Sequence, residues 1–232
     1  PVLQQDQIVF TAEGDLWQAS LDNMTARRLS SHLAEESQPV LSPDGKQLAF
    51  VADYDGASEI YLMPVAGGVA KRISYENSRV RIQQWLADGR ILYATDSAAG
   101  PANYWLLKVV EPDSLATETL PLADASGGSI DGQSGTVYFS RFGLQLTGDN
   151  TKVYRGGAMG ELWSWQLGST NEARRLSAEH KGSISQPVFY QGRVYFVSDA
   201  DGNSNIWSVA ADGTDATQHS FHKNWRIGRI SV

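Results

Sequence analysis

The sequence predicts an all-β protein, a β-propeller built from four-stranded antiparallel blades, and three observations support this prediction. A polar, an apolar and an aromatic residue recur in that order five times, and the aromatic positions lie 44, 44, 58 and 44 residues apart. A triplet of β-branched and aromatic residues precedes each motif, as in buried strands. No segment has the sustained helical period that a solenoid of helix pairs would need. Short strands that repeat roughly every 40–45 residues are typical of propeller blades.

The first strand of each blade is predicted from a Pro-Val pair. Residues 38–41 (Gln-Pro-Val-Leu) and 186–189 (Gln-Pro-Val-Phe) match closely, and residues 1–3 (Pro-Val-Leu) are the same motif without its first residue. A turn follows, clearest at residues 42–45 (Ser-Pro-Asp-Gly), because proline presets φ and glycine tolerates a positive φ.

The other three strands of each blade are marked by short motifs. The second strands contain Ile8-Val9-Phe10, Leu48-Ala49-Phe50, Ile91-Leu92-Tyr93, Val137-Tyr138-Phe139 and Val194-Tyr195-Phe196. The third strands begin with Asp15-Leu16-Trp17, Glu59-Ile60-Tyr61, Asn103-Tyr104-Trp105, Glu161-Leu162-Trp163 and Asn205-Ile206-Trp207. The fourth strands contain Arg28-Leu29-Ser30, Arg72-Ile73-Ser74, Thr119-Leu120-Pro121, Arg175-Leu176-Ser177 and the degenerate Gln218-His219-Ser220.

The motifs divide the chain into repeats within one propeller domain, residues 1–232. The predicted blades span about 1–30, 37–74, 80–121, 127–177 and 184–220, and residues 224–232 are predicted to open a sixth blade. We favour a six-bladed propeller of which the chain holds five blades and one strand, because residues 1–3 already open the first blade. The alternative is a closed five-bladed ring completed by the last strand.

Composition excludes several classes of function. With 19 Lys and Arg against 26 Asp and Glu the net charge is −7, which argues against a nucleic-acid partner, since phosphates need a basic face. The absence of cysteine removes disulfides, thiol nucleophiles and thiolate metal sites. No apolar run approaches the length of a membrane span. We expect no cofactor.

Residues 42–50 (Ser-Pro-Asp-Gly-Lys-Gln-Leu-Ala-Phe), with the Asp-Gly turn at 53–56 and Glu59-Ile60-Tyr61, resemble the WD40-like repeats of the TolB and tricorn protease propellers. Longer features narrow the resemblance: 14–17 (Gly-Asp-Leu-Trp) leads to 26–32 (Ala-Arg-Arg-Leu-Ser-Ser-His), and Tyr154-Arg155-Gly156-Gly157 closes the long insert of the fourth repeat. Over essentially the whole chain, the sequence resembles the N-terminal six-bladed propeller of tricorn-like proteases.

The resemblance implies a non-catalytic role for this segment within a serine peptidase of the S41 type. In that family the polypeptide continues into a second propeller, a PDZ-like module and the peptidase core, so the catalytic residues would lie beyond Val232. The expected partners are peptides, the remaining domains of the parent protease and other proteins, and export to the periplasm is slightly favoured. The alternative is a stand-alone, TolB-like propeller that binds other proteins.

Two groups of residues are candidate contacts. Side chains that alternate along the first strands are expected to line the central channel of a propeller, and these are Ser37, Arg81, Gln83, Ser185 and Arg226. The insert, roughly residues 141–160, carries the polar and cationic side chains of Arg141, Lys152, Tyr154 and Arg155. These could engage a neighbouring domain or a peptide carboxylate, or the insert could be a tolerated surface loop.

Other polar motifs are better explained by structure than by chemistry. No Gly-x-Ser-x-Gly elbow is present, and the four histidines fall in or beside loops between blades. The Asp-x-Asp-Gly motifs at 53–56 and 199–202 lack the glutamate of a calcium loop and are predicted to be hairpin turns. Trp17, Trp105, Trp163 and Trp207 recur in register, which predicts packing between blades. Unpaired blade edges predict self-association.

Overall fold

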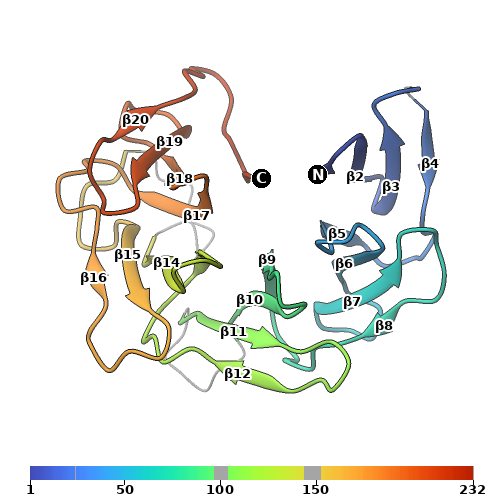
Figure 1. Cartoon of the computed structure of the whole chain (residues 1–232). Coiled ribbons are helices and arrows are strands. Elements are labelled where there is room, and N and C mark those ends of the chain that lie inside the picture. Colours follow the sequence, from blue (N-terminus) through green and yellow to red (C-terminus); the bar gives the residue numbers. More distant parts are fainter. Residues whose placement is uncertain (24, 97–103, 144–152, 232) are drawn as a thin grey trace. The chain divides into compact units, whose positions relative to one another are not determined.

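The computed structural model describes residues 1–23, 25–96, 104–143 and 153–231, and it contains five four-stranded antiparallel sheets (Figure 1). In each sheet the strands lie side by side in the order of the sequence, as in a propeller blade. Within these residues no helix is present that is long and apolar enough to cross a membrane. The predicted all-β propeller of four-stranded antiparallel blades is therefore confirmed.

The strands follow the predicted motifs, with two differences: β11 of blade 3 begins after Trp105, and Asn103 of its motif lies outside the described residues, while each fourth strand ends at the first residue of its motif. Blade 1 contains β1 (Val2–Gln4), β2 (Gln7–Ala12), β3 (Asp15–Ser20) and β4 (Ala26–Arg28). Blade 2 contains β5 (Glu36–Leu41), β6 (Gln47–Ala52), β7 (Glu59–Pro64) and β8 (Lys71–Arg72). Blade 3 contains β9 (Val80–Trp85), β10 (Ile91–Thr95), β11 (Leu106–Val110) and β12 (Thr117–Thr119). Blade 4 contains β13 (Gly127–Ile130), β14 (Thr136–Arg141), β15 (Glu161–Gln166) and β16 (Arg174–Arg175). Blade 5 contains β17 (Ile184–Tyr190), β18 (Arg193–Ser198), β19 (Asn205–Ala210) and β20 (Thr217–Gln218).

The predicted opening strand of a sixth blade is not formed. Residues 221–231 have no regular secondary structure, and Phe221 and Trp225 are 70% and 78% exposed. A strand is stabilised by ladder hydrogen bonds to a neighbouring strand, and none of the described residues provides such a ladder for this segment. The prediction of a six-bladed propeller is thus not supported. The described residues form five blades, the number in the alternative prediction.

The chain divides into two compact units, each described here by itself. The first comprises Pro1–Ala99 and Lys108–Leu120, and the second Gly100–Leu107 and Pro121–Val232. In the first unit, Leu16 of blade 1 belongs to the same buried cluster as Phe50 and Tyr61 of blade 2. In the second unit, Leu162 of blade 4 belongs to the same cluster as Phe196 of blade 5.

The hydrophobic core therefore lies between successive blades, and strands are buried on both faces. All five residues of β10 and the last five residues of β6 are buried. Because both faces are covered, these strands are continuous apolar runs without alternation of polar and apolar residues.

The repeated tryptophans are buried to different degrees. Trp105 is fully buried. Trp207 packs against the cluster between blades 4 and 5 and meets the His180 ring edge-on at 5.4 Å, so its predicted role in packing between blades is confirmed. Trp17 and Trp163 are only half-buried, which leaves part of each indole surface open.

Candidate functional site

A polar cluster closes the start of the third strand in four of the blades. A serine that follows the fourth strand accepts a hydrogen bond from the backbone N–H of the second residue of the third-strand motif. The donor and acceptor pairs are Leu16 and Ser30 (2.9 Å), Ile60 and Ser74 (2.8 Å), Leu162 and Ser177 (3.0 Å), and Ile206 and Ser220 (2.8 Å). The serine of the fourth-strand motif therefore has a structural role.

An arginine of the same motif pairs with the acidic residue that opens the third strand. In blade 2, Arg72 Nη2 lies 2.7 Å from Glu59 Oε1, and the Glu59 carboxylate also accepts bonds from the Ser74 hydroxyl and from the backbone N–H of Asn77 (2.8 Å). Arg28 pairs in the same way with Asp15, and Arg175 Nη2 lies 3.0 Å from Glu161 Oε1. The sequence contained this signal, because the acidic residue and the Arg-x-Ser motif recur together.

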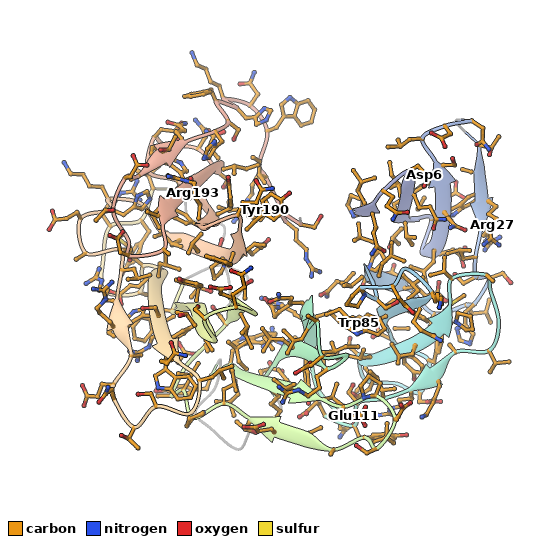
Figure 2. All side chains as sticks on the ribbon, viewed as in Figure 1. Asp6, Arg27, Trp85, Glu111, Tyr190 and Arg193 are labelled. Atoms are coloured by element: carbon orange, nitrogen blue, oxygen red, sulfur yellow. The ribbon has the colours of Figure 1, made fainter. Side chains whose placement is uncertain are left out.

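A second basic residue on the outer strand reaches the next blade. Arg27 Nη2, on β4, donates to the Val65 carbonyl oxygen at 2.9 Å, and Figure 2 labels Arg27. Lys71 Nζ donates to the Pro112 carbonyl oxygen at 3.4 Å. Arg174 Nη2 donates to the Asp212 carbonyl oxygen at 2.9 Å. Each acceptor lies at or beside the hairpin between the third and fourth strands of the following blade, so these contacts tie neighbouring blades together.

The buried carboxylate of Glu36 joins blades 1 and 2. Glu36 is 1% exposed, accepts a bond from the Leu16 N–H at 3.1 Å and also accepts the hydroxyls of Ser30 and Tyr54. Burial, followed by the hydrogen bond to Glu36, raises the pKa of Tyr54 above its ordinary value. The phenol therefore stays protonated and acts as a hydrogen-bond donor in this interface.

The predicted channel residues lie on first strands, with one exception. Ser37 lies on β5 and Arg81 and Gln83 lie on β9, all in the first unit, whereas Ser185 lies on β17 in the second unit. All four are half-buried. The exception, Arg226, is exposed in the C-terminal segment that forms no strand.

Three of the first strands carry a bulge that the sequence motifs did not reveal. The register shifts between Ser37 and Val40 in blade 2, between Ser185 and Val188 in blade 5, and opposite Leu92 and Tyr93 in blade 3. Gln38 and Gln186, which follow the two serines, have φ of 53° and 55°. Such a bulge turns side chains away from strict alternation, so the simple in-and-out register used for the prediction does not hold there.

Arg81 has an unusual environment for a cation. Burial lowers the pKa of its guanidinium from the ordinary value, the nearby Arg79 lowers it further, and Asp96 opposes both effects. Gln83 Nε2 donates to the Arg81 carbonyl oxygen at 3.1 Å, so these two predicted residues lie together.

The residues of the blade 4 insert separate into two groups. Arg155 is bound within the chain, since its Nη1 lies 3.1 Å from Asp199 Oδ1 and its Nη2 donates to the Asp199 carbonyl oxygen at 2.9 Å. Asp199 also accepts the N–H of Val153, which fixes the end of the insert to blade 5. Tyr154 is half-buried beside this contact. Lys152 lies outside the described residues.

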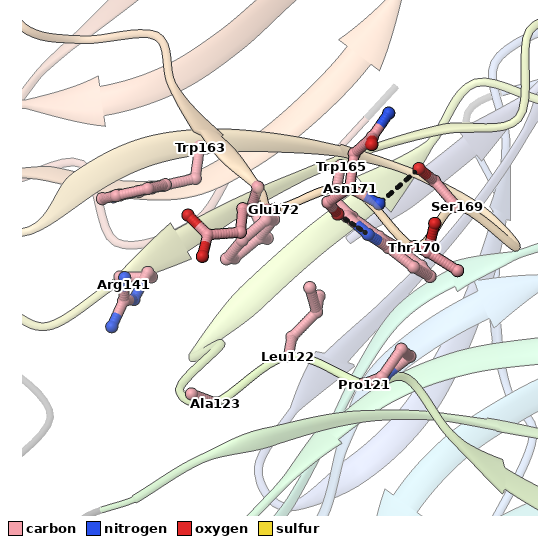
Figure 3. Close-up of a pocket in the computed structure, with 12 residues that line it drawn as sticks. Pro121, Leu122, Ala123, Arg141, Trp163, Trp165, Ser169, Thr170, Asn171 and Glu172 are labelled. Atoms are coloured by element: carbon pink, nitrogen blue, oxygen red, sulfur yellow. Dashed lines mark hydrogen bonds between the residues drawn. The ribbon is translucent and has the colours of Figure 1, made fainter.

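Arg141 belongs to a groove in the second unit. The groove has a volume of about 700 Å³ and is lined by segments 121–123 and 169–173 and by the side of blade 4 that carries Arg141, Trp163 and Trp165 (Figure 3). Phe139 pairs with Trp163 across β14 and β15, and the alternation of the two strands brings these side chains to one face.

The groove combines aromatic side chains with one cation, Arg141, and one carboxylate, Glu172. The Arg141 guanidinium carbon lies 4.8 Å from the Trp163 ring centroid and 4.8 Å from that of Phe142. Its Nε is buried and has no hydrogen-bond partner within the described part of the chain. The edges of the indoles are satisfied, because Trp163 Nε1 donates to Glu161 and Trp165 Nε1 donates to the Asn171 carbonyl oxygen. Phe139 and Trp165 are almost fully buried, so the surface open to a ligand is mainly that of the half-buried Trp163 and Arg141.

One hydroxyl and imidazole pair forms that could suggest a nucleophile. His180 Nε2 lies 2.8 Å from Ser198 Oγ. Ser198 is only 1% exposed, and the adjacent Asp199 carboxylate binds Ser183 N–H and Arg155. Burial lowers the pKa of His180, whereas Asp199 raises it and Arg155 lowers it. A substrate cannot reach this hydroxyl in the structure, so the pair is structural.

The Asp-x-Asp-Gly motifs form hairpin turns, as predicted. Gly56 and Gly202 have φ of 111° and 97°, and their N–H groups donate to the carbonyl oxygens of Asp53 and Asp199. Among the described residues no cluster of three or more histidine and acidic side chains is suited to a metal ion.

Comparison with known proteins places the chain in a family. The sequence profile of the tricorn protease N-terminal beta propeller domain matches residues 1–232. Tricorn protease homolog 1 of Streptomyces coelicolor is 34% identical over 215 residues, which are 92% of this chain and 20% of that protein. The putative tricorn-like protease N-terminal subunit of Sulfurisphaera tokodaii is 27% identical over 73% of this chain and 87% of that protein.

Solved structures share the fold. The crystal structure of the tricorn protease superposes with a TM-score of 0.81 at 24% identity, over 97% of this chain and 22% of that one. A putative TolB from Agrobacterium tumefaciens superposes with a TM-score of 0.70 at 19% identity, over 92% of this chain and 76% of that one. The chain spans about a fifth of the length of tricorn protease homolog 1. By this match along all of its residues, the chain belongs to the family of tricorn protease N-terminal β-propeller domains.

Proposed function

We propose that the chain serves a tricorn-type serine peptidase as a non-catalytic propeller that positions or gates peptides and docks against the peptidase part. The observation that carries this proposal is the family match over residues 1–232, combined with relatives that are proteases about five times as long. The buried Ser198 and His180 pair supports a non-catalytic role for this segment, because its hydroxyl is out of reach of a substrate.

Docking between separate parts is supported by one pair of relatives. In Sulfurisphaera tokodaii the related proteins are named as an N-terminal subunit and a C-terminal subunit of a tricorn-like protease. If these subunits act together, a propeller of this family recognises the peptidase part through its surface and without a covalent connection. We extend this to the present chain.

A peptidase assay on the full-length polypeptide tests the proposal. We expect the full-length protein to cleave peptides, residues 1–232 alone to be inactive, and a deletion of residues 1–232 to change kcat/KM with a dependence on peptide length. The length dependence separates positioning or gating from a general loss of folding, which thermal denaturation of the deletion variant checks. Equal kcat/KM values for peptides of every length, with and without the propeller, would contradict the proposal.

A stand-alone interaction propeller is the second candidate function. It is supported by the TM-score of 0.70 with the putative TolB, of which the match covers 76%. The two candidates differ in the natural gene, because a coding sequence without a peptidase region would favour the stand-alone propeller. Periplasmic export remains a proposal that fractionation of cells tests.

A further inference from the structure

We propose that the groove on blade 4 is a docking site for an acidic segment of the peptidase part, in which a carboxylate side chain lies beside apolar side chains. This inference rests on the proposed function for the source of the segment. It adds the place of the contact, its anchor residue, Arg141, and the chemistry of the occupant.

Arg141 is the first argument for an acidic occupant. Its guanidinium is half-buried and is stacked on the aromatic rings of Phe142 and Trp163, yet among the described residues it forms no ion pair, and its Nε has no acceptor. Other arginines of the chain behave differently: Arg72, Arg155 and Arg193 each pair with a carboxylate. A half-buried cation without a counter-ion carries a desolvation cost, which an incoming carboxylate that contacts the guanidinium would reduce with a charge-assisted bond.

The lining of the groove is the second argument, because it favours apolar neighbours for that carboxylate. Leu122, Ala123 and the indole of Trp165 face a volume of about 700 Å³, which is enough for several side chains. Figure 3 shows Arg141 and Trp163 at one end, Ser169 and Thr170 at the other and Glu172 between them, so the cation occupies one end only and a carboxylate of the chain lies beyond it. An occupant with a single acid at the Arg141 end, and with apolar side chains and no second acid beside Glu172, matches this distribution.

The position of the groove in its blade is the third argument, and it favours a protein segment over a peptide in transit. The lining comes from β14, β15, the link that precedes β16 and the link that precedes β13. No residue of the first strands β13 or β17 contributes to the lining. First strands are those that line the central channel of a propeller, whereas this groove is formed by later strands and links of blade 4.

Binding of short blocked peptides to the 232-residue chain tests the assignment. The probe is acetyl-Leu-Asp-Phe-amide, and the matched peptide acetyl-Leu-Asn-Phe-amide lacks only the charge. Binding is followed by the indole N–H signals of Trp163 and Trp165 in ¹⁵N–¹H NMR spectra. We expect saturable shifts of both signals with the aspartyl peptide and at least about tenfold weaker binding of the asparaginyl peptide, as for loss of a charge-assisted pair.

Variants identify the anchor. Arg141→Gln should lower the affinity for the aspartyl peptide by about tenfold or more. Arg141→Lys should lower this affinity less, because lysine keeps the charge but lacks the planar guanidinium. The control variant Arg90→Gln also removes one arginine charge, but in the first unit, where Arg90 pairs with Asp88. It should bind the aspartyl peptide with the affinity of the parent chain. The urea midpoint of Arg141→Gln shows whether the blade remains folded.

Three results would overturn the proposal: equal binding of the two blocked peptides, unchanged binding to Arg141→Gln, or tighter binding of Leu-Asn-Phe with a free terminal carboxylate. The last result would assign the groove to peptide ends. These readings do not depend on peptidase activity. If deletion of residues 1–232 reduces cleavage but the 232-residue chain does not bind the aspartyl peptide, only the groove assignment is wrong. If the chain binds the peptide but the deletion leaves cleavage unchanged, the proposed function is wrong.

Discussion

Breaking the buried pair of Glu59 and Arg72 in blade 2 should destabilise the protein by several kcal/mol. The Glu59 side chain is fully buried and that of Arg72 is 23% exposed, and Glu59 also binds Ser74 and the Asn77 N–H. Glu59→Gln keeps the shape and an acceptor oxygen for Arg72 but removes the charge, and its NH2 group replaces the oxygen that accepts the Ser74 hydroxyl. Breaking a buried pair costs roughly 3–5 kcal/mol. Because Asp55 lies 3.6 Å from Arg72 and remains as a partner, we expect a loss of about 3 kcal/mol.

Urea unfolding at pH 7, followed by tryptophan fluorescence, measures this loss. With a denaturant slope of about 2–3 kcal/mol per molar, the midpoint of Glu59→Gln should fall by about 1 M. The control is Arg90→Gln, since the side chains of Arg90 and Asp88 are 39% and 51% exposed and such pairs contribute less than about 1 kcal/mol. A Glu59→Gln midpoint equal to that of the control would refute the assignment of the pair as a main stabilising contact.

Three further predictions concern packing, pH and association. Gly160→Ala should lower the melting temperature, because a Cβ there would lie 2.0 Å from the Ile184 carbonyl oxygen, whereas Gly157→Ala meets no atom within 4 Å and should not; equal temperatures would contradict this. Burial lowers the pKa of His180, so the unfolded state binds the proton more tightly than the folded state. The stabilisation that comes from neutral, buried His180 is therefore complete above the unfolded pKa of 6.5 and is lost as pH falls below it. Urea midpoints between pH 5 and 7.5 should show this slope, and His180→Asn should flatten it. On size exclusion the apparent mass of the chain should exceed its calculated 25.3 kDa, because unpaired strand edges and exposed aromatic side chains favour association. Elution as a monomer would disprove this prediction.

The repeat motifs predicted the blades because each motif is set by packing that recurs in every blade. Leu16 and Leu162 occupy equivalent places between successive blades, and the same residue types return at the same spacing. The turns were predictable for a similar reason, since Gly56 needs the positive φ that its motif implies. The strands and turns were therefore predictable because they depend on residue types within the motif itself.

Elements that depend on a distant partner could not be predicted. The alternation around Trp225 favours a strand, but a strand also needs a neighbour, and the described residues provide none. The bulge at Gln38 carries no glycine to indicate its positive φ. Of the insert residues, Arg155 is bound to Asp199 and Arg141 stacks on Trp163, and nothing in their sequence neighbourhood distinguishes the two.

The hydrogen bonds from Arg27, Lys71 and Arg174 to the following blade bear on how repeats are added by duplication. Blade 2 carries both halves of the contact, since its Val65 carbonyl oxygen accepts from Arg27 of blade 1 and its Lys71 donates to Pro112 of blade 3. A duplicate of such a repeat would inherit both halves and could bind its neighbours on each side without new surface residues. Glu118 stands at this position in blade 3 and pairs instead with Arg90, so this repeat lacks the donor. Gain and loss of single contacts of this kind would let descendants of one ancestral unit diverge while the array stays connected.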